Sequence, residues 1–480
     1  MVQKFDIILL PQKSNIKKEG QEMSRKIKQK NEEIVNLKVR FTEKPVTVMG
    51  GMKLIAEWFR KIELQKHLNE LTKPLDPRSN RGYKPAKVIM SFMVSVIMGA
   101  KKLSHSVILE NDEPVKKLFA LSKIPSVSTF SRFFRKIKRG LIEEIFPVLN
   151  GWLLELRKAE IPTDGITIDL DSSVFERYGE QEGAEVGYNP KKPGRPSHHP
   201  IFAMISDIKF LMHFWLRRGK TVSISGAKEF LEEVLGRLPE YIKIKVIRAD
   251  SGFFSGKFFD FVEGKLLKYM VVVRTNKIIA GIVRYISVKE WKKIAEGIEI
   301  GETEYQANVW QKARRLIVIR QNLEIRPNAQ GKLFPDMPIY RHQIIVTNLT
   351  WKVEDIWNYY RQRAGMENYI KEFKKDYSMD KYSFSKFYAT EAAMWLIAIT
   401  WNILGWFKKS ILEKDNIRLM TVRLRYFLCG GILGNEKGQP VLRLHSGVKW
   451  RSVFLRLLNR VFLFQIPNAM QLKIIDGKGV

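Results

Sequence analysis

Two aspartates, Asp171 and Asp250, each end a segment with the pattern of a β-strand. Asp171 closes the alternating segment 166–171, and Asp250 lies just beyond the apolar segment 242–247. Two carboxylates that lie close together repel each other unless a cation lies between them. Carboxylate oxygens are the ligands that Mg²⁺ and Mn²⁺ prefer. If the fold brings the two strand ends together, the pair predicts a site for a divalent cation.

A third carboxylate, Glu367, lies in a segment with helical spacing. On one continuous helix, at about 100° per residue, Tyr360, Arg363, Glu367 and Lys374 fall within an arc of roughly 60°. Such a face joins a metal-ligating carboxylate to two cations and a phenol, which can hold a metal ion and bind phosphates. The alternative is a solvated, salt-bridged surface, because Arg363 and Glu367 are also an i, i+4 pair.

The elements around the aspartates predict a mixed sheet. Within 166–171 the side chains of Thr167, Asp169 and Asp171 share one face of a strand. A right-handed crossover through one helix returns the strand 242–247 parallel to the first strand and places Asp171 beside Asp250 at one edge of the sheet. The other expected elements are strands at 201–208, 210–216 and 269–274 and helices at 226–238 and 253–266.

The flanking regions differ in character from this α/β region. We expect a basic arm over 1–38, a helical DNA-binding domain over 39–160 and a helical C-terminal region over 411–480. The catalytic domain is expected over 161–410, with a β-rich insertion at about 277–342.

Charge and composition point to a polyanionic partner. The 480 residues include 83 Lys plus Arg and 50 Asp plus Glu, so the net charge is +33. A charge of this size favours nucleic acid over a merely basic surface. The single cysteine, Cys429, excludes an internal disulfide framework and a multi-cysteine zinc site. The longest apolar runs, 88–100 and 392–407, are shorter than the ~20 residues that span a bilayer. We therefore expect a cytoplasmic, nucleoid-associated protein with no membrane segment.

Several basic groups are candidate DNA contacts. The Gly/Pro-rich loop around Lys191, Lys192 and Arg195 suits phosphate contact, and the alternative is a solvated loop. The segment 126–136 predicts a helix with a Ser/Thr cap and a basic face, either the recognition helix of a helix-turn-helix or an ordinary amphipathic helix. Trp291 and Trp310 in the insertion could stack a flipped base, although core packing is the commoner role of such residues.

Taken together, these segments resemble a known family. The spacing Y-x2-R-x3-E-x6-K from Tyr360 to Lys374 resembles the signature of cut-and-paste insertion-sequence transposases with a DDE active site. Asp169-Leu170-Asp171-Ser172-Ser173 and Ile247-Arg248-Ala249-Asp250-Ser251-Gly252 are similar to the two aspartate motifs of one branch, the insertion-sequence group numbered thirteen-eighty. The resemblance runs from about residue 39 to near the C-terminus.

The resemblance implies an RNase H-like catalytic core and an activity. Asp171, Asp250 and Glu367 would be catalytic ligands of two divalent cations, Mg²⁺ or Mn²⁺. One cation would activate water or a 3′-hydroxyl, and the other would stabilise the leaving oxygen of a phosphodiester displacement. The Asp-Ser-Ser context favours Asp171 as the first ligand, and Asp169, on the same strand face, is the alternative.

The same resemblance implies roles for the basic residues and for the whole protein. Tyr360, Arg363 and Lys374 would bind strand-end phosphates. The protein would be a transposase that binds the terminal inverted repeats of its element, cleaves the ends and joins them to target DNA. Double-stranded DNA is the expected partner, and we expect a homodimer in the DNA complex.

Two other functions compete with transposition. A structure-selective nuclease of the same fold would cut DNA without strand transfer. A DNA-binding protein derived from a transposase would keep the charge and lose the chemistry, but the presence of all three carboxylates argues against it.

Overall fold

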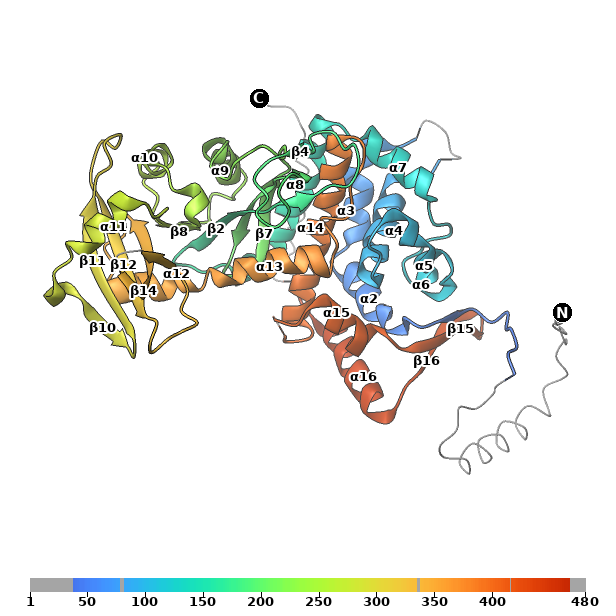
Figure 1. The fold of residues 1–480 in the computed structure, drawn as a ribbon. Helices are drawn as coiled ribbons and strands as arrows, with labels where there is room; N and C mark the ends of the chain where they lie inside the picture. Colours follow the sequence, from blue (N-terminus) through green and yellow to red (C-terminus); the bar gives the residue numbers. More distant parts are fainter. Residues whose placement is uncertain (1–37, 78–81, 335–336, 415, 467–480) are drawn as a thin grey trace, which may run out of the picture. The chain divides into compact units, whose positions relative to one another are not determined.

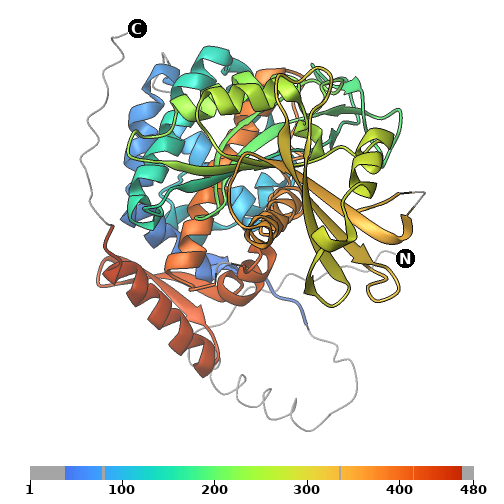
Figure 2. The same cartoon turned by 90° about the vertical axis from the view of Figure 1, so that its left-hand side faces the viewer.

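The structure, a computed structural model, describes residues 38–77, 82–334, 337–414 and 416–466. The chain forms two compact units, 1–44 and 45–480. Every helix and strand described below belongs to the second unit (Figures 1 and 2). The basic arm expected over 1–38 lies outside the described residues except for Lys38.

A large mixed sheet forms the centre of this unit, which confirms the α/β prediction. Its strands are ordered β10-β11-β12-β14-β9-β8-β2-β6-β7, with β13 paired to β14. The pairs β2–β8 and β8–β9 are parallel, and the others are antiparallel. The first group of strands comprises β2 (Ile166–Ser172), β6 (Ile201–Ile205), β7 (Phe210–Trp215), β8 (Ile244–Ala249) and β9 (Tyr269–Val272).

Helices cover both faces of the sheet. α9 (Ala227–Gly236) connects β7 to β8, and α10 (Gly256–Gly264) connects β8 to β9. These two helices lie on one face, and α12 (Val353–Arg361) lies on the other (Figure 1). Successive residues of β8 enter the two separate cores, Val246 beside α12 and Ile247 on the opposite face. Burial on both faces explains why β2 and β8 are apolar apart from a few charged residues.

The β-rich insertion joins this same sheet. Its long strand β14 pairs with β9, and β12 and β11 follow outward. Strands make up most of the regular structure of this segment, which also contains the helix α11 (Lys277–Arg284). The insertion strands are β10 (Lys292–Ala295), β11 (Ile298–Tyr305), β12 (Arg314–Asn322), β13 (Lys332–Phe334) and β14 (Met337–Thr347).

A long buried helix, α14 (Phe387–Ser410), lies between the sheet and the N-terminal helices (Figure 1). It packs against β7 of the sheet and against α4, α7 and α8. The boundary expected at residue 160 therefore does not separate two cores, and the role of 39–160 in DNA binding stays a prediction. The helices before the sheet are α2 (Lys53–Lys61), α3 (Leu64–Leu71), α4 (Pro85–Met98), α5 (Val107–Glu110), α6 (Glu113–Leu118), α7 (Val127–Lys136) and α8 (Arg139–Leu156).

The prediction of a wholly helical C-terminal region is wrong for one segment. β15 (Gly430–Glu436) and β16 (Gln439–His445) form a hairpin, and β1 (Val46–Thr47) adds a third strand. Lys437 and Gly438 connect the two strands with positive φ angles of 50° and 84°. A two-residue turn with both φ angles positive matches the twist of a hairpin. Helical structure is present in α15 (Leu419–Val422) and α16 (Val448–Leu463), and α16 packs on α2.

Candidate active site

The two aspartates stand at the ends of adjacent parallel strands, as the crossover argument predicted. In the register of β2 and β8, Leu170 lies opposite Ala249. Asp171 and Asp250 are the next residue on each strand. The α9 crossover thus brings together two carboxylates that are far apart in the sequence, at the edge where open α/β sheets place their sites.

The other two candidate carboxylates, Asp250 and Glu367, are close enough to Asp171 for their charges to act on it. Burial raises the pKa of Asp171 to about 6. The Arg363 guanidinium, with Nη2 3.5 Å from Oδ2 of Asp171, opposes this rise. The charges of Asp250 and Glu367 add to the rise. Asp171 is therefore a buried carboxyl group on which one cation, Arg363, and two further carboxylates act.

The Ser-Gly pair after Asp250 shapes the end of β8. The Asp250 carboxylate accepts a hydrogen bond of 2.9 Å from the backbone N–H of Gly252 and caps a short 3₁₀ turn. A Cβ at residue 252 would lie 2.7 Å from the side chain of Ser223, whose hydroxyl is 2.8 Å from that of Ser172. Glycine is required there because the turn packs closely against the loop before α9.

Glu367 lies on α13 (Ala364–Lys375), but the predicted continuous helix is broken. α12 ends at Arg361, and α13 begins three residues later. Between them the backbone N–H groups of Arg363, Gly365 and Met366 each bond the carbonyl three residues back. This spacing is that of a 3₁₀ turn, which is tighter than an α-helix. Glu367 is exposed and is carried on the second helix.

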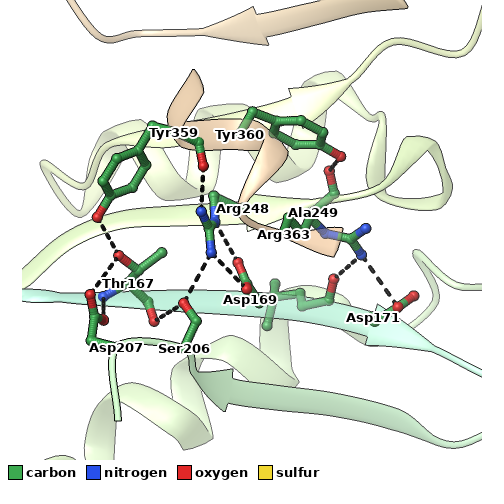
Figure 3. A network of polar contacts seen from close by, with 11 residues as sticks. Thr167, Asp169, Asp171, Ser206, Asp207, Arg248, Ala249, Tyr359, Tyr360 and Arg363 are labelled. Carbon is green, nitrogen blue, oxygen red and sulfur yellow. Dashed lines mark hydrogen bonds and ion pairs between the residues drawn. The ribbon is translucent and has the colours of Figure 1, made fainter. Parts of the chain in front are cut away.

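Tyr360 and Arg363 lie inside the protein and bond the ends of the two aspartate strands (Figure 3). The Tyr360 hydroxyl donates to the carbonyl of Ala249 at 3.1 Å. Arg363 donates through Nη2 to the carbonyl of Leu170 at 2.8 Å. Burial of Arg363, which is 7% exposed, excludes the solvated ion-pair interpretation of this side chain. These two residues therefore hold the carbonyl that precedes each aspartate.

Asp169, the alternative first ligand, is fully engaged elsewhere. Its Oδ1 accepts from Nε of Arg248 at 2.6 Å, and its Oδ2 accepts from Nη2 at 2.8 Å. Asp169 and Arg248 are 1% and 2% exposed. This pairing leaves Asp171 as the carboxylate of β2 that faces Asp250 and Glu367. No role for Arg248 was expected from the sequence, because its position opposite Asp169 depends on the register of β2 and β8.

The predicted basic residues are divided between the site and the surface. Lys374 donates through Nζ to the carbonyl of Val174 at 3.0 Å. Burial lowers its pKa, and the charges of Asp171 and Lys191 act on it in opposite directions. Lys191, on the basic loop, is exposed, and its charge acts on Lys374. Lys192 pairs with Glu176 at 2.8 Å, and Arg195 stacks on the Tyr178 ring.

Two further candidate DNA contacts have different outcomes. Trp310 is buried against Phe254 and Phe259, so it belongs to the core and offers no ring for a flipped base. On α7, Phe130 and Phe134 pack inward, whereas the basic residues of the predicted recognition helix remain exposed. This exposure fits both a DNA-binding helix and a solvated basic face.

The donor chemistry of the site fits hard divalent cations. As placed, no three His, Cys, Asp or Glu side chains among the described residues are close enough together to hold a metal ion. Asp171 and Asp250 nevertheless present carboxylates at adjacent strand ends. Burial, and after it the charges of Asp250 and Glu367, raise the pKa of Asp171, and a cation bound there would favour its ionised form. Across the described part of the chain, no helix is long and apolar enough to span a membrane.

The family model described as transposase DDE domain group 1 matches residues 29–466, so the chain belongs to this transposase family. Among solved structures, the chain is similar to the piggyBac transposase synaptic complex with hairpin DNA, at 13% identity and a TM-score of 0.41. That match covers 90% of this chain and 89% of the other. No curated protein matches the chain significantly.

Proposed function

We propose that this protein is the transposase of a bacterial-type insertion sequence related to the group numbered thirteen-eighty. It binds the terminal inverted repeats of its element, cleaves the ends and transfers the strands to target DNA. The observation that carries the proposal is the placement of Asp171 and Asp250 at adjacent strand ends, within electrostatic range of Glu367, in a member of a DDE transposase family.

Asp171, Asp250 and Glu367 are the proposed catalytic residues and the ligands of two divalent cations, Mg²⁺ or Mn²⁺. Bound at these carboxylates, the cations supply activation of the attacking hydroxyl and stabilisation of the leaving oxygen in an in-line displacement. Glu367 is exposed on α13, and its charge acts on Asp171. Arg363 balances part of the charge of Asp171 in the free protein.

The basic residues bind the DNA backbone in this proposal. Lys374 and Lys191 are close enough to affect each other electrostatically, and Asp171 also acts on Lys374, so both lysines are candidates to bind the phosphates of a strand end at the aspartates. Arg195 and Lys192 extend this surface along the loop. The buried bonds of Tyr360 and Arg363 favour a role in holding the strands, and direct phosphate contact by these two stays a prediction.

The remaining parts of the proposal concern the whole protein. A net charge of +33 supports binding to both repeat and target DNA. An RNase H-like core over 161–410, a DNA-binding domain over 39–160 and a homodimer in the DNA complex are part of the proposal.

An end-processing assay tests this function. The purified chain is incubated in Mg²⁺ with a labelled duplex carrying the inverted repeat of the element that encodes it and with a target plasmid. Cleavage at the repeat boundary followed by joining to the target is the expected result. Cutting without joining would favour a structure-selective nuclease. Specific binding without cutting would favour a DNA-binding protein derived from a transposase.

A further inference from the structure

Arg248 connects the two strands that carry the aspartates. In the parallel register it lies opposite Asp169, and each residue of this pair comes two positions before an aspartate of the site. The guanidinium binds Asp169 through two hydrogen bonds of 2.6 and 2.8 Å. Two parallel bonds fix orientation as well as distance. The pair therefore fixes β2 and β8 relative to each other near the ends that present Asp171 and Asp250.

The same guanidinium also binds the helix that leads to Glu367 (Figure 3). Arg248 Nη1 donates to the carbonyl of Tyr359 at 2.5 Å, in the last turn of α12. Carbonyls in the last turn of a helix lack intrahelical partners, and a cation there is favourable. The Tyr359 ring packs against the guanidinium at 5.2 Å, and its hydroxyl is 2.6 Å from that of Thr167 on β2. Arg248 thus ends α12 where the tight turn to α13 begins.

Arg248 makes a further hydrogen bond besides those to Asp169 and Tyr359. Arg248 Nη2 also donates to the hydroxyl of Ser206 at 3.0 Å, at the end of β6. Every described polar partner of this guanidinium belongs to β2, α12 or the segment after β6. A buried ion pair gives weak net stability, because removing two charges from water costs about as much as the pair returns. We expect the Asp169–Arg248 pair to matter for geometry, because the three carboxylates of the site repel one another and the strands and helices that carry them must be held in place.

We infer that Asp169 and Arg248 are positioning residues of the active site, which set the relative placement of Asp171, Asp250 and the turn into α13. The inference rests on the proposed function, because it assigns these residues to the same divalent-cation site. Neither residue touches substrate. Both act through β2 and β8, which end at Asp171 and Asp250, and through α12, which leads into α13 and Glu367.

A double substitution separates positioning from stability. Asp169→Leu with Arg248→Met removes both buried charges and keeps similar volumes, and such replacements are often neutral or stabilising. The matched control is Glu263→Leu with Arg314→Met, another ion pair with a buried arginine, between α10 and β12. We measure thermal unfolding, Mn²⁺ binding to the DNA-free protein by electron paramagnetic resonance, and single-turnover cleavage in Mg²⁺.

The expected result is a folded double variant in which Mn²⁺ binds about 10–100-fold more weakly and cleavage slows to a similar extent. The control pair should retain wild-type Mn²⁺ binding. If the first double variant does not fold, Arg248→Lys takes its place, because it keeps the charge but cannot span Asp169 and Tyr359 together. Weaker Mn²⁺ binding in this variant is again the expected result.

A folded Asp169→Leu/Arg248→Met or Arg248→Lys variant with wild-type Mn²⁺ affinity and cleavage would overturn the inference and leave the proposed function standing. A wild-type chain that neither binds Mn²⁺ nor cuts repeat DNA would overturn the proposed function and the inference together.

Discussion

Tyr360 and Arg363 bond the carbonyls of two residues that face each other across adjacent parallel strands. Tyr360 reaches Ala249, 111 residues away, and Arg363 reaches Leu170, 193 residues away. These carbonyls directly precede Asp250 and Asp171. The turn between α12 and α13 therefore holds both strand ends from a distant part of the chain, and this contact explains why an α-helix tightens at that point.

The pKa of Asp171 predicts a pH-dependent stability. Burial, with added repulsion from Asp250 and Glu367, raises this pKa from 3.8 to about 6. The folded protein then binds the proton of Asp171 more tightly than the unfolded chain does. The stability that this protonation adds is fully present below about pH 4 and is lost as the pH rises through about 6. In EDTA, Asp171→Asn should gain up to about 3 kcal/mol over wild type between pH 4 and 8. Thermal unfolding across this range measures the difference, and parallel curves would contradict it.

Tyr360→Phe tests the bond to the strand end. The change removes one hydroxyl and keeps the ring, so it should cost about 0.5–1.5 kcal/mol of stability. Cleavage should fall by more than this loss explains, because the end of β8 is freed. Tyr382→Phe is the matched control, since its hydroxyl also bonds a carbonyl, that of Ala100, at 3.1 Å. Equal cleavage rates for Tyr360→Phe and Tyr382→Phe would contradict a role of the Tyr360 hydroxyl in the active site.

Arg363→Lys distinguishes two roles of the arginine. A lysine keeps the charge but loses the fork that reaches both Leu170 and Asp171. If Arg363 holds the strand, repeat-DNA affinity should stay near wild type while Mn²⁺ binding and cleavage weaken. If Arg363 instead binds a terminal phosphate, affinity for the repeat end should fall as well. Arg157→Lys, at a buried arginine that also bonds a carbonyl and a carboxylate, controls for lost packing.

The net charge of +33 predicts strong salt dependence of DNA binding. Neutralising six to ten phosphates would cost about 10³–10⁵ in affinity between roughly 50 and 200 mM salt. Lys191→Ala should lower the slope of log affinity against log salt by about 1. Lys192→Ala should lower it less, because Lys192 already pairs with Glu176. Fluorescence anisotropy with repeat DNA measures both slopes. An affinity that does not change with salt concentration would contradict the claim that the positive charge of this protein binds DNA.

Much of the sheet was predictable because strands and crossovers follow local rules. Alternation marked β2, the apolar run marked β8, and the return of the chain through one helix predicted that β8 is parallel to β2, with Asp171 beside Asp250. The pairing of β14 with β9 was not predictable, because no local pattern says which strand an insertion will join. The hairpin at 430–445 was missed although Lys437-Gly438 carried a turn signal.

The interior of the site was harder to predict than its carboxylates. The segment 360–363 contains neither proline nor glycine, so the break between α12 and α13 has no local marker and follows from tertiary bonds to β2 and β8. The partner of Arg248 depends on strand register, which links residues 79 positions apart. The turn between α12 and α13 also determines that Arg363 is buried while Glu367 is exposed.

The proposed roles of Asp169 and Asp171 predict that substitution by asparagine affects stability at one position and activity at the other. Asp169→Asn leaves Arg248 buried without its charge partner, and breaking such a pair costs about 3–5 kcal/mol. Asp171→Asn weakens only the longer contact of 3.5 Å with Arg363, which keeps its bond to the Leu170 carbonyl, so this variant should be more stable than Asp169→Asn and still lose activity. Cleavage by the two variants must therefore be compared at temperatures where each is folded.

The most direct measurement of the central claim is single-turnover cleavage of a repeat-end duplex in Mg²⁺ by Asp171→Asn, Asp250→Asn and Glu367→Gln. Each change keeps the shape of the side chain and removes the charge that would hold a cation. We predict loss of cleavage in all three variants, with repeat binding and thermal unfolding at or above wild-type levels. Cleavage by Asp250→Asn at a rate near that of the wild type would contradict the assignment of this site.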